Sequence, residues 1–218
     1  MAIRDLFWAC PICGREGGLD SARRGSEVCG GCSTRFSRGR GSAITAHTPG
    51  RPPITLSPAE WVDRLPELDV EERIRRAEAA GSALLSEPAL LRLQAGEVPV
   101  YFRGRYLNQI EDLGPPRHGL LQLFPDRVTF LPTGAGEEGG DAASSITWPF
   151  GEITAVQPSS STLQLNSRRL PLASFKVPGG SIRFWEALLC AALARYYLMN
   201  GLGEIIEFQP RIATRRAT

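Results

Sequence analysis

Four cysteines near the N-terminus have the spacing of a metal-binding site. They form two C-x2-C pairs, Cys10 with Cys13 and Cys29 with Cys32, with fifteen residues between the pairs. Two thiolates that are two residues apart can bind one ion from a single tight turn, and two such turns complete a tetrahedral shell of four sulfurs. The spacing therefore predicts a structural zinc site at these four residues, with no open position for a substrate.

Other uses of the cysteines are less well supported. Two disulfides require an oxidising compartment, and the N-terminal sequence MAIRDLFWACPIC has charges and cysteines where a secretion signal would be apolar. A thioredoxin-like redox pair requires a single C-x-x-C next to a βαβ pattern. An iron–sulfur cluster is an alternative for four thiolates, although two paired turns favour zinc. Cys190 lies in an apolar helical stripe and is expected to be a small buried hydrophobe.

The segment that must position the four cysteines is small. Gly14, Gly30 and Gly31 are expected to let the backbone turn toward the sulfurs. The core candidates within residues 1–40 are Leu6, Phe7, Trp8, Val28 and Phe36. Because so small a core rarely folds alone, metal binding is expected to supply much of the folding free energy of this region.

Residues 8–36 resemble the zinc-ribbon family through their two cysteine turns, CPICG and CGGC. This resemblance implies a zinc ribbon in residues 1–40. Members of this family bind nucleic acids or proteins, so the resemblance implies a scaffold and leaves the partner open.

The next two regions differ in their turn and helix signals. Residues 41–56 contain Pro-Gly and Pro-Pro pairs and are expected to form a linker. Ser57, Pro58 and Glu60 predict a capped helix start, and a similar signal precedes the segment VEERIRRAEAAG. Residues 57–87 are therefore expected to be a helical segment of two short helices.

Residues 88–218 have the pattern of a β-domain. Short segments rich in β-branched and aromatic residues are separated by turn clusters such as GPPRHG and QPSSS. The segment VPVYFRGRYL is expected to form one strand, with Arg103 and Arg105 on the same face. The segment SIRFWEALLCAALARYYLMN has helical spacing and is followed by Gly201. The predicted fold class is α+β: a four-cysteine ribbon and a mostly antiparallel β-domain closed by a C-terminal helix and followed by a tail.

The order of these segments resembles the pleckstrin-homology superfold, and more specifically its GRAM-type branch. The residues that carry the resemblance are GLLQLFPDRVTFLP, ITWPFGEITAV, TLQL and FKVPGGSIRFWEALL. Members that bind phosphoinositides usually have a basic cluster after the first strand, whereas this chain has only Arg103 and Arg105 there. These two arginines either bind one acidic group together or are ordinary charges on a solvated sheet face.

Composition and motifs exclude several functions. The net charge is only +2, and no run of 18 uncharged apolar residues occurs, so we expect a cytoplasmic protein without a transmembrane helix. Peripheral attachment to a membrane stays open. The two histidines, His47 and His118, have no evident nucleophile beside them, and no nucleotide-binding or hydrolase motif is present. We therefore expect no enzymatic activity. Lys176 is the only lysine among 25 basic residues, which indicates the coding bias of a GC-rich, bacterial genome.

The preferred hypothesis is an adaptor that docks through the β-domain onto a protein complex or an anionic membrane surface. A protein partner is favoured because the net charge is small and the basic clusters are thin. The alternative is a nucleic-acid-binding regulator whose ribbon contacts phosphates through Arg15, Arg23, Arg24, Arg35, Arg38 and Arg40. Zinc with four thiolates would lower the +4 charge of residues 1–56 to about +2, which disfavours that alternative. A third hypothesis, an accessory subunit of a lipid-modifying enzyme, rests on the fold resemblance alone.

Overall fold

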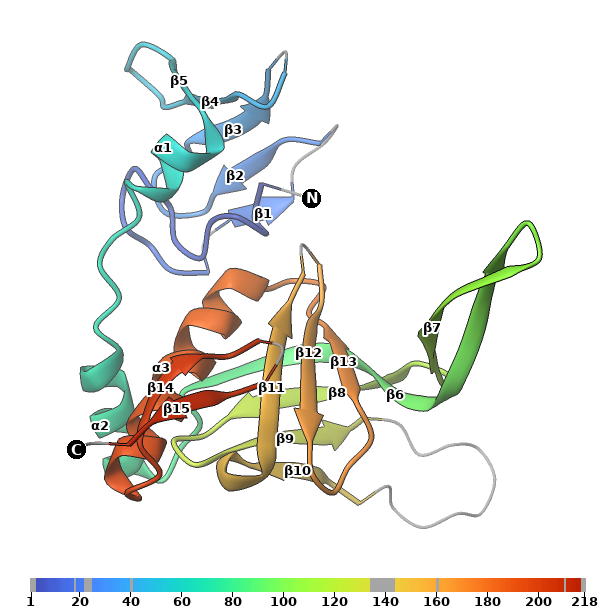
Figure 1. The fold of residues 1–218 in the computed structure, drawn as a ribbon. Coiled ribbons are helices and arrows are strands. Elements are labelled where there is room, and N and C mark those ends of the chain that lie inside the picture. The colour runs from blue at the N-terminus through green and yellow to red at the C-terminus, as the bar shows by residue number, and fades with distance from the viewer. Residues whose placement is uncertain are drawn as a thin grey trace. The chain divides into compact units, whose positions relative to one another are not determined.

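The structure is a computed structural model of the 218-residue chain (Figure 1). It describes residues 3–17, 19–21, 25–39, 41–133, 144–159, 161–209 and 211–216. The chain folds into two compact units. The first unit comprises Met1–Asp69 and Gly180–Trp185, and the second comprises Val70–Gly179 and Glu186–Thr218.

The first unit contains a five-stranded antiparallel sheet whose strands are neighbours in sequence order. The strands are β1 (Leu19–Ser21), β2 (Glu27–Cys29), β3 (Arg35–Arg38), β4 (Ile44–His47) and β5 (Ile54–Leu56). A short helix, α1 (Pro58–Val62), follows β5.

The prediction of a linker at residues 41–56 was wrong, because these residues form β4 and β5. Ile44 and Ala46 are buried and alternate with Thr45 and His47, which is the two-residue period of a strand with one buried face. The proline and glycine residues that indicated a linker instead make the turn between the two strands. The predicted ribbon boundary after residue 40 therefore cuts through the sheet.

The helix start predicted at Ser57 is confirmed, and its helix completes the core of the first unit. The Ser57 Oγ accepts a hydrogen bond from the Glu60 backbone N–H, and the Ser57 N–H donates to the Glu60 carboxylate at 2.8 Å. This cap directs Trp61 into the core, where its Nε1 donates to the carbonyl of Ile44 at 2.9 Å. The Trp61 ring packs edge-on against Phe36 at 5.7 Å.

The predicted core of residues 1–40 was incomplete. Leu6, Phe7 and Phe36 are buried as expected. Trp8 and Val28 are only half-buried, and Trp8 stacks on Phe184 of the same unit at 5.2 Å. The buried cluster also includes residues beyond position 40, namely Ile44, Ala46 and Trp61.

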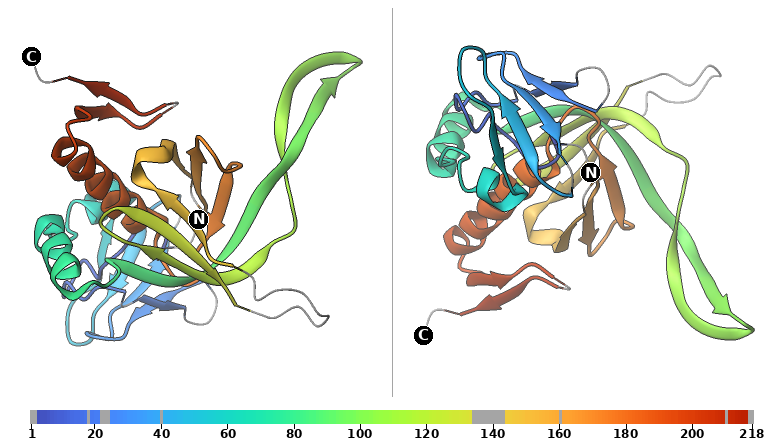
Figure 2. Two further views of the ribbon diagram at one scale, coloured as in Figure 1. Left: turned by 90° about the horizontal axis from the view of Figure 1, so that it is seen from below. Right: turned by 90° about the horizontal axis from the view of Figure 1, so that it is seen from above.

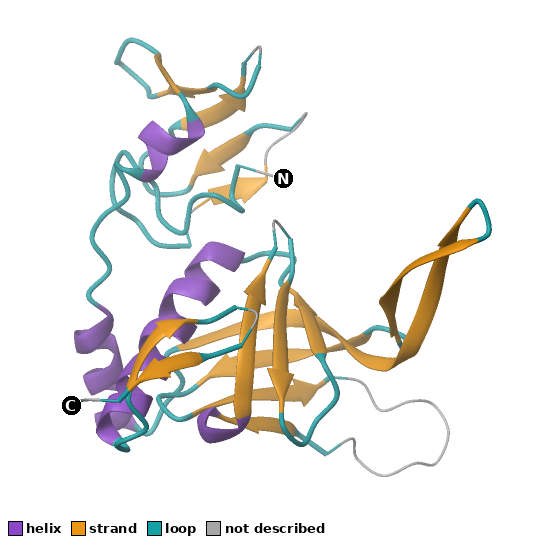
Figure 3. Ribbon diagram, in the orientation of Figure 1, coloured by secondary structure: helices purple, strands orange, loops and turns teal. Residues whose placement is uncertain are grey.

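The second unit is a mostly antiparallel β-domain that also contains helices (Figure 3). Its eight-stranded sheet consists of β6 (Leu85–Phe102), β7 (Arg105–Leu113), β8 (Arg117–Leu123), β9 (Arg127–Pro132), β10 (Ile146–Pro149), β11 (Ile153–Pro158), β12 (Leu163–Ser167) and β13 (Ala173–Lys176). The strand order is β10-β9-β8-β6-β13-β12-β11, and β7 pairs only with β6. A single 3-10 turn, η1 (Phe150–Glu152), connects β10 to β11.

The expected C-terminal helix is present as α3 (Ile182–Met199), and another helix, α2 (Val70–Ala80), precedes the sheet. Leu188, Leu189 and Leu193 of α3 are fully buried. A final hairpin of β14 (Glu204–Glu207) and β15 (Ala213–Arg215) follows α3. Within the described residues, no helix combines the length and the apolar character that crossing a bilayer requires.

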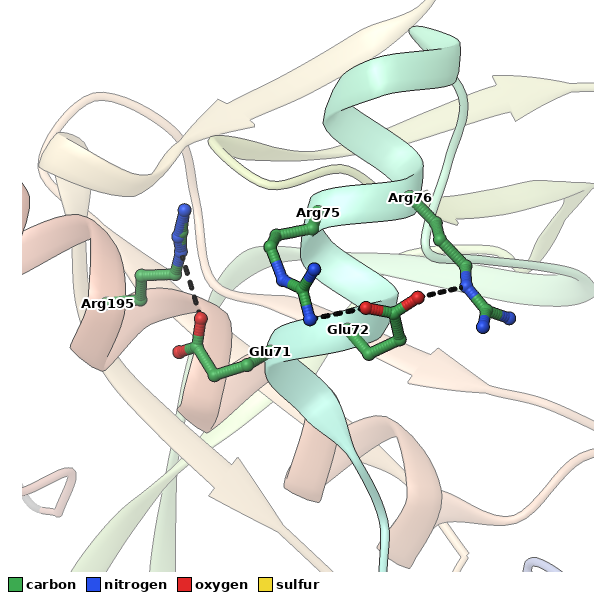
Figure 4. A network of polar contacts seen from close by, with 5 residues as sticks. All are labelled: Glu71, Glu72, Arg75, Arg76 and Arg195. Carbon is green, nitrogen blue, oxygen red and sulfur yellow. Dashed lines mark hydrogen bonds and ion pairs between the residues drawn. The ribbon is translucent and has the colours of Figure 1, made fainter.

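Ion pairs connect α2 to α3 (Figure 4). Arg195 of α3 is largely buried and lies 3.6 Å from the carboxylate of Glu71 and 3.2 Å from that of Glu78. Glu72 faces away from α3 and pairs with Arg75 and Arg76 of its own helix. Because Arg195 joins two elements, its pairs fix the position of α2, whereas the exposed pairs within α2 contribute little.

A long hairpin extends from the sheet of the second unit. The first part of β6 pairs with β8 and β13, but from Gly96 onward β6 pairs only with β7. The hairpin formed by residues 96–112 leaves the sheet in every view (Figures 1 and 2). All its residues are exposed except Val100, which is half-buried.

The prediction that VPVYFRGRYL forms one strand was wrong. Arg103 and Gly104 form a two-residue turn with positive φ values of 49° and 78°, which is the geometry that joins two antiparallel strands tightly. Tyr101 therefore lies opposite Tyr106. Arg103 belongs to the turn and Arg105 begins β7, so the two arginines do not share a strand face.

Candidate metal centre

The first cysteine turn is a tight loop closed by backbone hydrogen bonds. The N–H of Cys10 donates to the carbonyl of Arg15 at 2.9 Å, and the N–H of Gly14 donates to the carbonyl of Cys10 at 2.8 Å. Gly14 has a φ of +75°. This conformation is unfavourable for any residue that has a Cβ atom. The expectation that Gly14 relieves the backbone at this turn is confirmed.

The second cysteine turn repeats the hydrogen bonding of the first. The N–H of Cys29 donates to the carbonyl of Thr34 at 2.9 Å, and the N–H of Ser33 donates to the carbonyl of Cys29 at 2.9 Å. Ser33 occupies the position of Gly14 and has a φ of +56°. Neither Gly30 nor Gly31 has a positive φ, so in this turn that conformation falls to Ser33.

Gly31 instead provides space between the two turns. A Cβ atom at this position would lie 2.8 Å from the Cδ of Arg15 and 3.5 Å from the Sγ of Cys13. The Gly31 N–H also donates to the Sγ of Cys29 at 3.3 Å. The absence of a side chain at Gly31 thus lets the second turn approach the first closely.

The two turns bring the four sulfurs together. Cys10 Sγ lies 3.7 Å from Cys32 Sγ, and Cys13 Sγ lies 3.6 Å from Cys29 Sγ. All four sulfur atoms lie within 4.8 Å of one another. These separations exceed the S–S bond length of about 2.05 Å, so the cysteines are not disulfide-bonded. The cluster has the size of a shell around one metal ion.

Hydrogen bonds to sulfur favour the thiolate that metal binding requires. Burial acts to raise the pKa of Cys32, but hydrogen bonds from the Thr34 hydroxyl and backbone and from neighbouring thiols lower this pKa to about 7. The Thr34 Oγ lies 3.1 Å from Cys32 Sγ and 3.0 Å from the Oγ of Thr48. Burial raises the pKa of Cys10, so an uncharged thiol is preferred there unless a cation compensates the charge.

The four-cysteine cluster is continuous with the core of the first unit. Cys10 and Cys29 are fully buried and belong to the same apolar cluster as Phe7, Phe36 and Trp61. Cys32 is half-buried and Cys13 is exposed. Sequence reasoning missed Thr34 and Thr48, whose hydroxyls support Cys32, because nothing in the spacing of isolated threonines indicates a contact with sulfur.

The structure disperses the other predicted site residues. Arg15 donates to the carbonyl of Gly30 at 3.2 Å, so it supports the second cysteine turn. Arg35 and Arg38 lie at opposite ends of β3. Arg23, Arg24 and Arg40 lie outside the described residues.

Among the described residues, the cluster of possible metal ligands includes neither Cys190 nor a histidine. Cys190 is a free, half-buried thiol, and burial with the nearby charge of Glu186 raises its pKa to about 12. It is thus less buried than predicted but stays protonated. His47 lies on β4 and His118 on β8, so neither is in the linker or turn expected for it.

Comparisons with known proteins do not identify a family. The sequence matches no protein-family model and no curated protein. Among solved structures, it is similar to the C-terminal domain of an unknown protein from Leishmania infantum, with 14% sequence identity and a TM-score of 0.35. This similarity covers 57% of the present chain and 99% of that domain, and at such a TM-score it identifies neither a shared fold nor a shared function.

Proposed function

We propose that Cys10, Cys13, Cys29 and Cys32 bind one structural zinc ion. A Zn–S distance of about 2.3 Å places the sulfurs of a regular tetrahedron about 3.8 Å apart. The separations of 3.6 and 3.7 Å across the two turns support this geometry. A shell of four protein ligands leaves no position for a substrate, which supports a structural role and not a catalytic one.

Metal analysis of the purified chain tests this proposal. We expect about one zinc per chain, and Cys29→Ser should lose most of it. Cys190→Ser is the matched control, because it removes a thiol outside the cluster and should leave the zinc content unchanged. Iron in place of zinc, or equal metal content in both variants, would overturn the assignment.

We propose further that the chain is a non-catalytic adaptor that docks onto a protein through the hairpin of residues 96–112. The observation that carries this proposal is the exposure of large apolar side chains along the hairpin. Six of the ten such side chains in the described residues lie there, each 46–60% exposed: Val98, Tyr101, Phe102, Tyr106, Leu107 and Ile110. Such a concentration is typical of a binding surface.

The charges of the hairpin favour a protein over an anionic membrane. Glu97 lies directly opposite Glu111, and Asp112 is adjacent. Like charges in facing positions repel each other, and a cationic side chain of a partner would relieve this repulsion. An anionic lipid surface would instead add to it. We therefore propose a partner with an apolar groove that is basic where it meets Glu97 and Glu111, and acidic where it meets Arg103 and Arg105.

Site-specific photo-crosslinking in the native host tests the docking proposal. A crosslinker at Tyr106 should capture a defined protein that a crosslinker at Ile206, an equally exposed residue on β14, does not capture. With that protein purified, Phe102→Ser should weaken binding at least tenfold. Equal capture at both positions, or flotation with anionic vesicles that depends on Phe102, would overturn it.

The pleckstrin-homology and GRAM resemblance remains part of the proposal for the second unit. The order of elements along the chain supports it. Apart from the hairpin strand β7, four neighbouring strands (β6 and β8 to β10) are followed by three more (β11 to β13) and then by α3. The docking proposal does not depend on it, because it rests on the exposed hairpin alone.

A further inference from the structure

An open pocket lies on the surface of the first unit, next to the four-cysteine cluster. It is largely open to solvent, and its volume of about 530 Å³ is within the range of small-ligand sites. Its lining is Ser33, Arg35, Ser37, His47, Thr48, Pro49 and Arg51. All of these residues except Pro49 carry a hydroxyl, imidazole or guanidinium group, and none carries a carboxylate.

Strand pairing and one turn bring these side chains together. Arg35 of β3 lies directly opposite His47 of β4, and Ser37 projects from the same face two residues further on. The intervening residue, Phe36, points into the buried core. The turn after β4 is closed by a hydrogen bond from the Arg51 N–H to the Thr48 carbonyl at 3.1 Å, which returns Arg51 toward the pocket.

The metal centre holds one wall of the pocket. The Oγ of Thr48 lies 3.0 Å from that of Thr34, which lies 3.1 Å from the Sγ of Cys32. Ser33 directly follows Cys32, and its N–H bonds to the carbonyl of Cys29. The hydroxyls of Thr48 and Ser33 are therefore attached to a rigid frame, which reduces the entropy lost when a ligand binds.

The pocket has an uncompensated positive charge. Its lining includes no carboxylate, and in the described part of the chain neither Arg35 nor Arg51 forms an ion pair. The acidic residue on this face of the sheet is Asp20 of β1, which pairs with β2 and is thus separated from β3 by a whole strand. An anion bound between the two arginines would relieve their mutual repulsion.

We propose that this pocket binds the phosphate group of a small phosphorylated molecule. Two guanidinium groups match the oxygens of a phosphate in bidentate geometry, and the hydroxyls of Ser33 and Ser37 supply further donors. The Thr48 hydroxyl donates to the Thr34 Oγ, because Thr34 donates its own proton to Cys32, so Thr48 forms part of the pocket wall. A nucleic-acid backbone would require cations along an extended track. The cations here converge on one concave site, while Arg15 is engaged with the Gly30 carbonyl.

This proposal is tested by isothermal titration calorimetry of the full chain. The ligands are pyrophosphate, glycerol 3-phosphate and an oligonucleotide without terminal phosphates. Arg35→Gln and Arg51→Gln should each raise the Kd for pyrophosphate about tenfold or more. Arg38→Gln removes the same charge from the far end of β3 and should change the Kd less than twofold. Unchanged zinc content in each variant shows that the fold persists.

Three results would overturn the proposal. One is the absence of binding by either small phosphate compound. Another is equal weakening by all three arginine substitutions, which would mean non-specific charge attraction. The third is binding of the oligonucleotide that pyrophosphate does not displace, which would indicate a nucleic-acid surface. None of these outcomes bears on the hairpin.

Discussion

Substitution of Trp61 tests whether residues 44–61 belong to the metal-binding fold. Trp61→Phe removes the hydrogen bond to the Ile44 carbonyl and part of a ring that is fully buried against Phe36. A lost buried hydrogen bond and a small cavity together should destabilise the first unit by about 2–3 kcal/mol. If folding of this unit is coupled to zinc binding, the same free energy weakens zinc affinity by about 30- to 140-fold.

Chelator competition measures this change, and the chain offers a matched control. Trp148 is also fully buried, but it lies in the second unit and its Nε1 has no hydrogen-bond partner in the described residues. Trp148→Phe should therefore leave the zinc affinity within about threefold of the unsubstituted chain, well below the tenfold that 1.4 kcal/mol represents. The reasoning is refuted if Trp61→Phe also retains its zinc affinity, because the strands after residue 40 would then fold independently of the metal centre.

Other substitutions probe the turns and strands. Ser33→Gly should stabilise the first unit by about 0.5–1 kcal/mol, measured by chemical denaturation, because it removes a Cβ from a residue with positive φ. Ser57→Ala should destabilise that unit by about 1 kcal/mol. Ser57→Ala should also raise the pKa of Glu60, which hydrogen bonds from Ser57 hold below its usual value, as measured by NMR titration. Gly119→Ala should destabilise the second unit by about 2–4 kcal/mol, whereas Gly96→Ala should change little.

The outcomes that contradict these predictions are specific. A Ser33→Gly variant that is less stable would mean that the Ser33 hydroxyl contributes more than the strain costs. At pH values above the ordinary pKa of Glu60, the ionised carboxylate stabilises the helix start. This stabilisation is lost as the pH falls through the lowered pKa that Glu60 has in the folded chain. An unchanged Glu60 titration in Ser57→Ala would exclude the capping box. Tolerance of Gly119→Ala would contradict its position, where a Cβ would lie 2.5 Å from the Leu131 carbonyl oxygen.

Local patterns predicted the convergence of the four cysteines correctly, because its geometry depends on few residues. Each C-x2-C pair lies within one turn, and the Ser57 cap lies within four residues, so the sequence contains the whole interaction. The mostly antiparallel second unit could be predicted in outline for a similar reason. In β8, for example, buried residues alternate with half-buried ones.

The missed features depend on contacts between distant residues or on ambiguous turn signals. Nothing local shows that Ile44 and Trp61 complete the core around Phe36, so the segment between them looked like a linker. The hairpin turn at Arg103 and Gly104 was missed because both sides continue the β pattern. A glycine within such a run can be either a strand residue or a turn.

The path of β6 has a mechanical consequence. The same strand that forms one arm of the hairpin continues inward between β8 and β13. A pull on the hairpin by a bound protein would act along this strand, and hydrogen bonds on both of its sides would bear the load together in shear. A strand held in this way resists being pulled out of the sheet better than an edge strand, whose hydrogen bonds would break one after another.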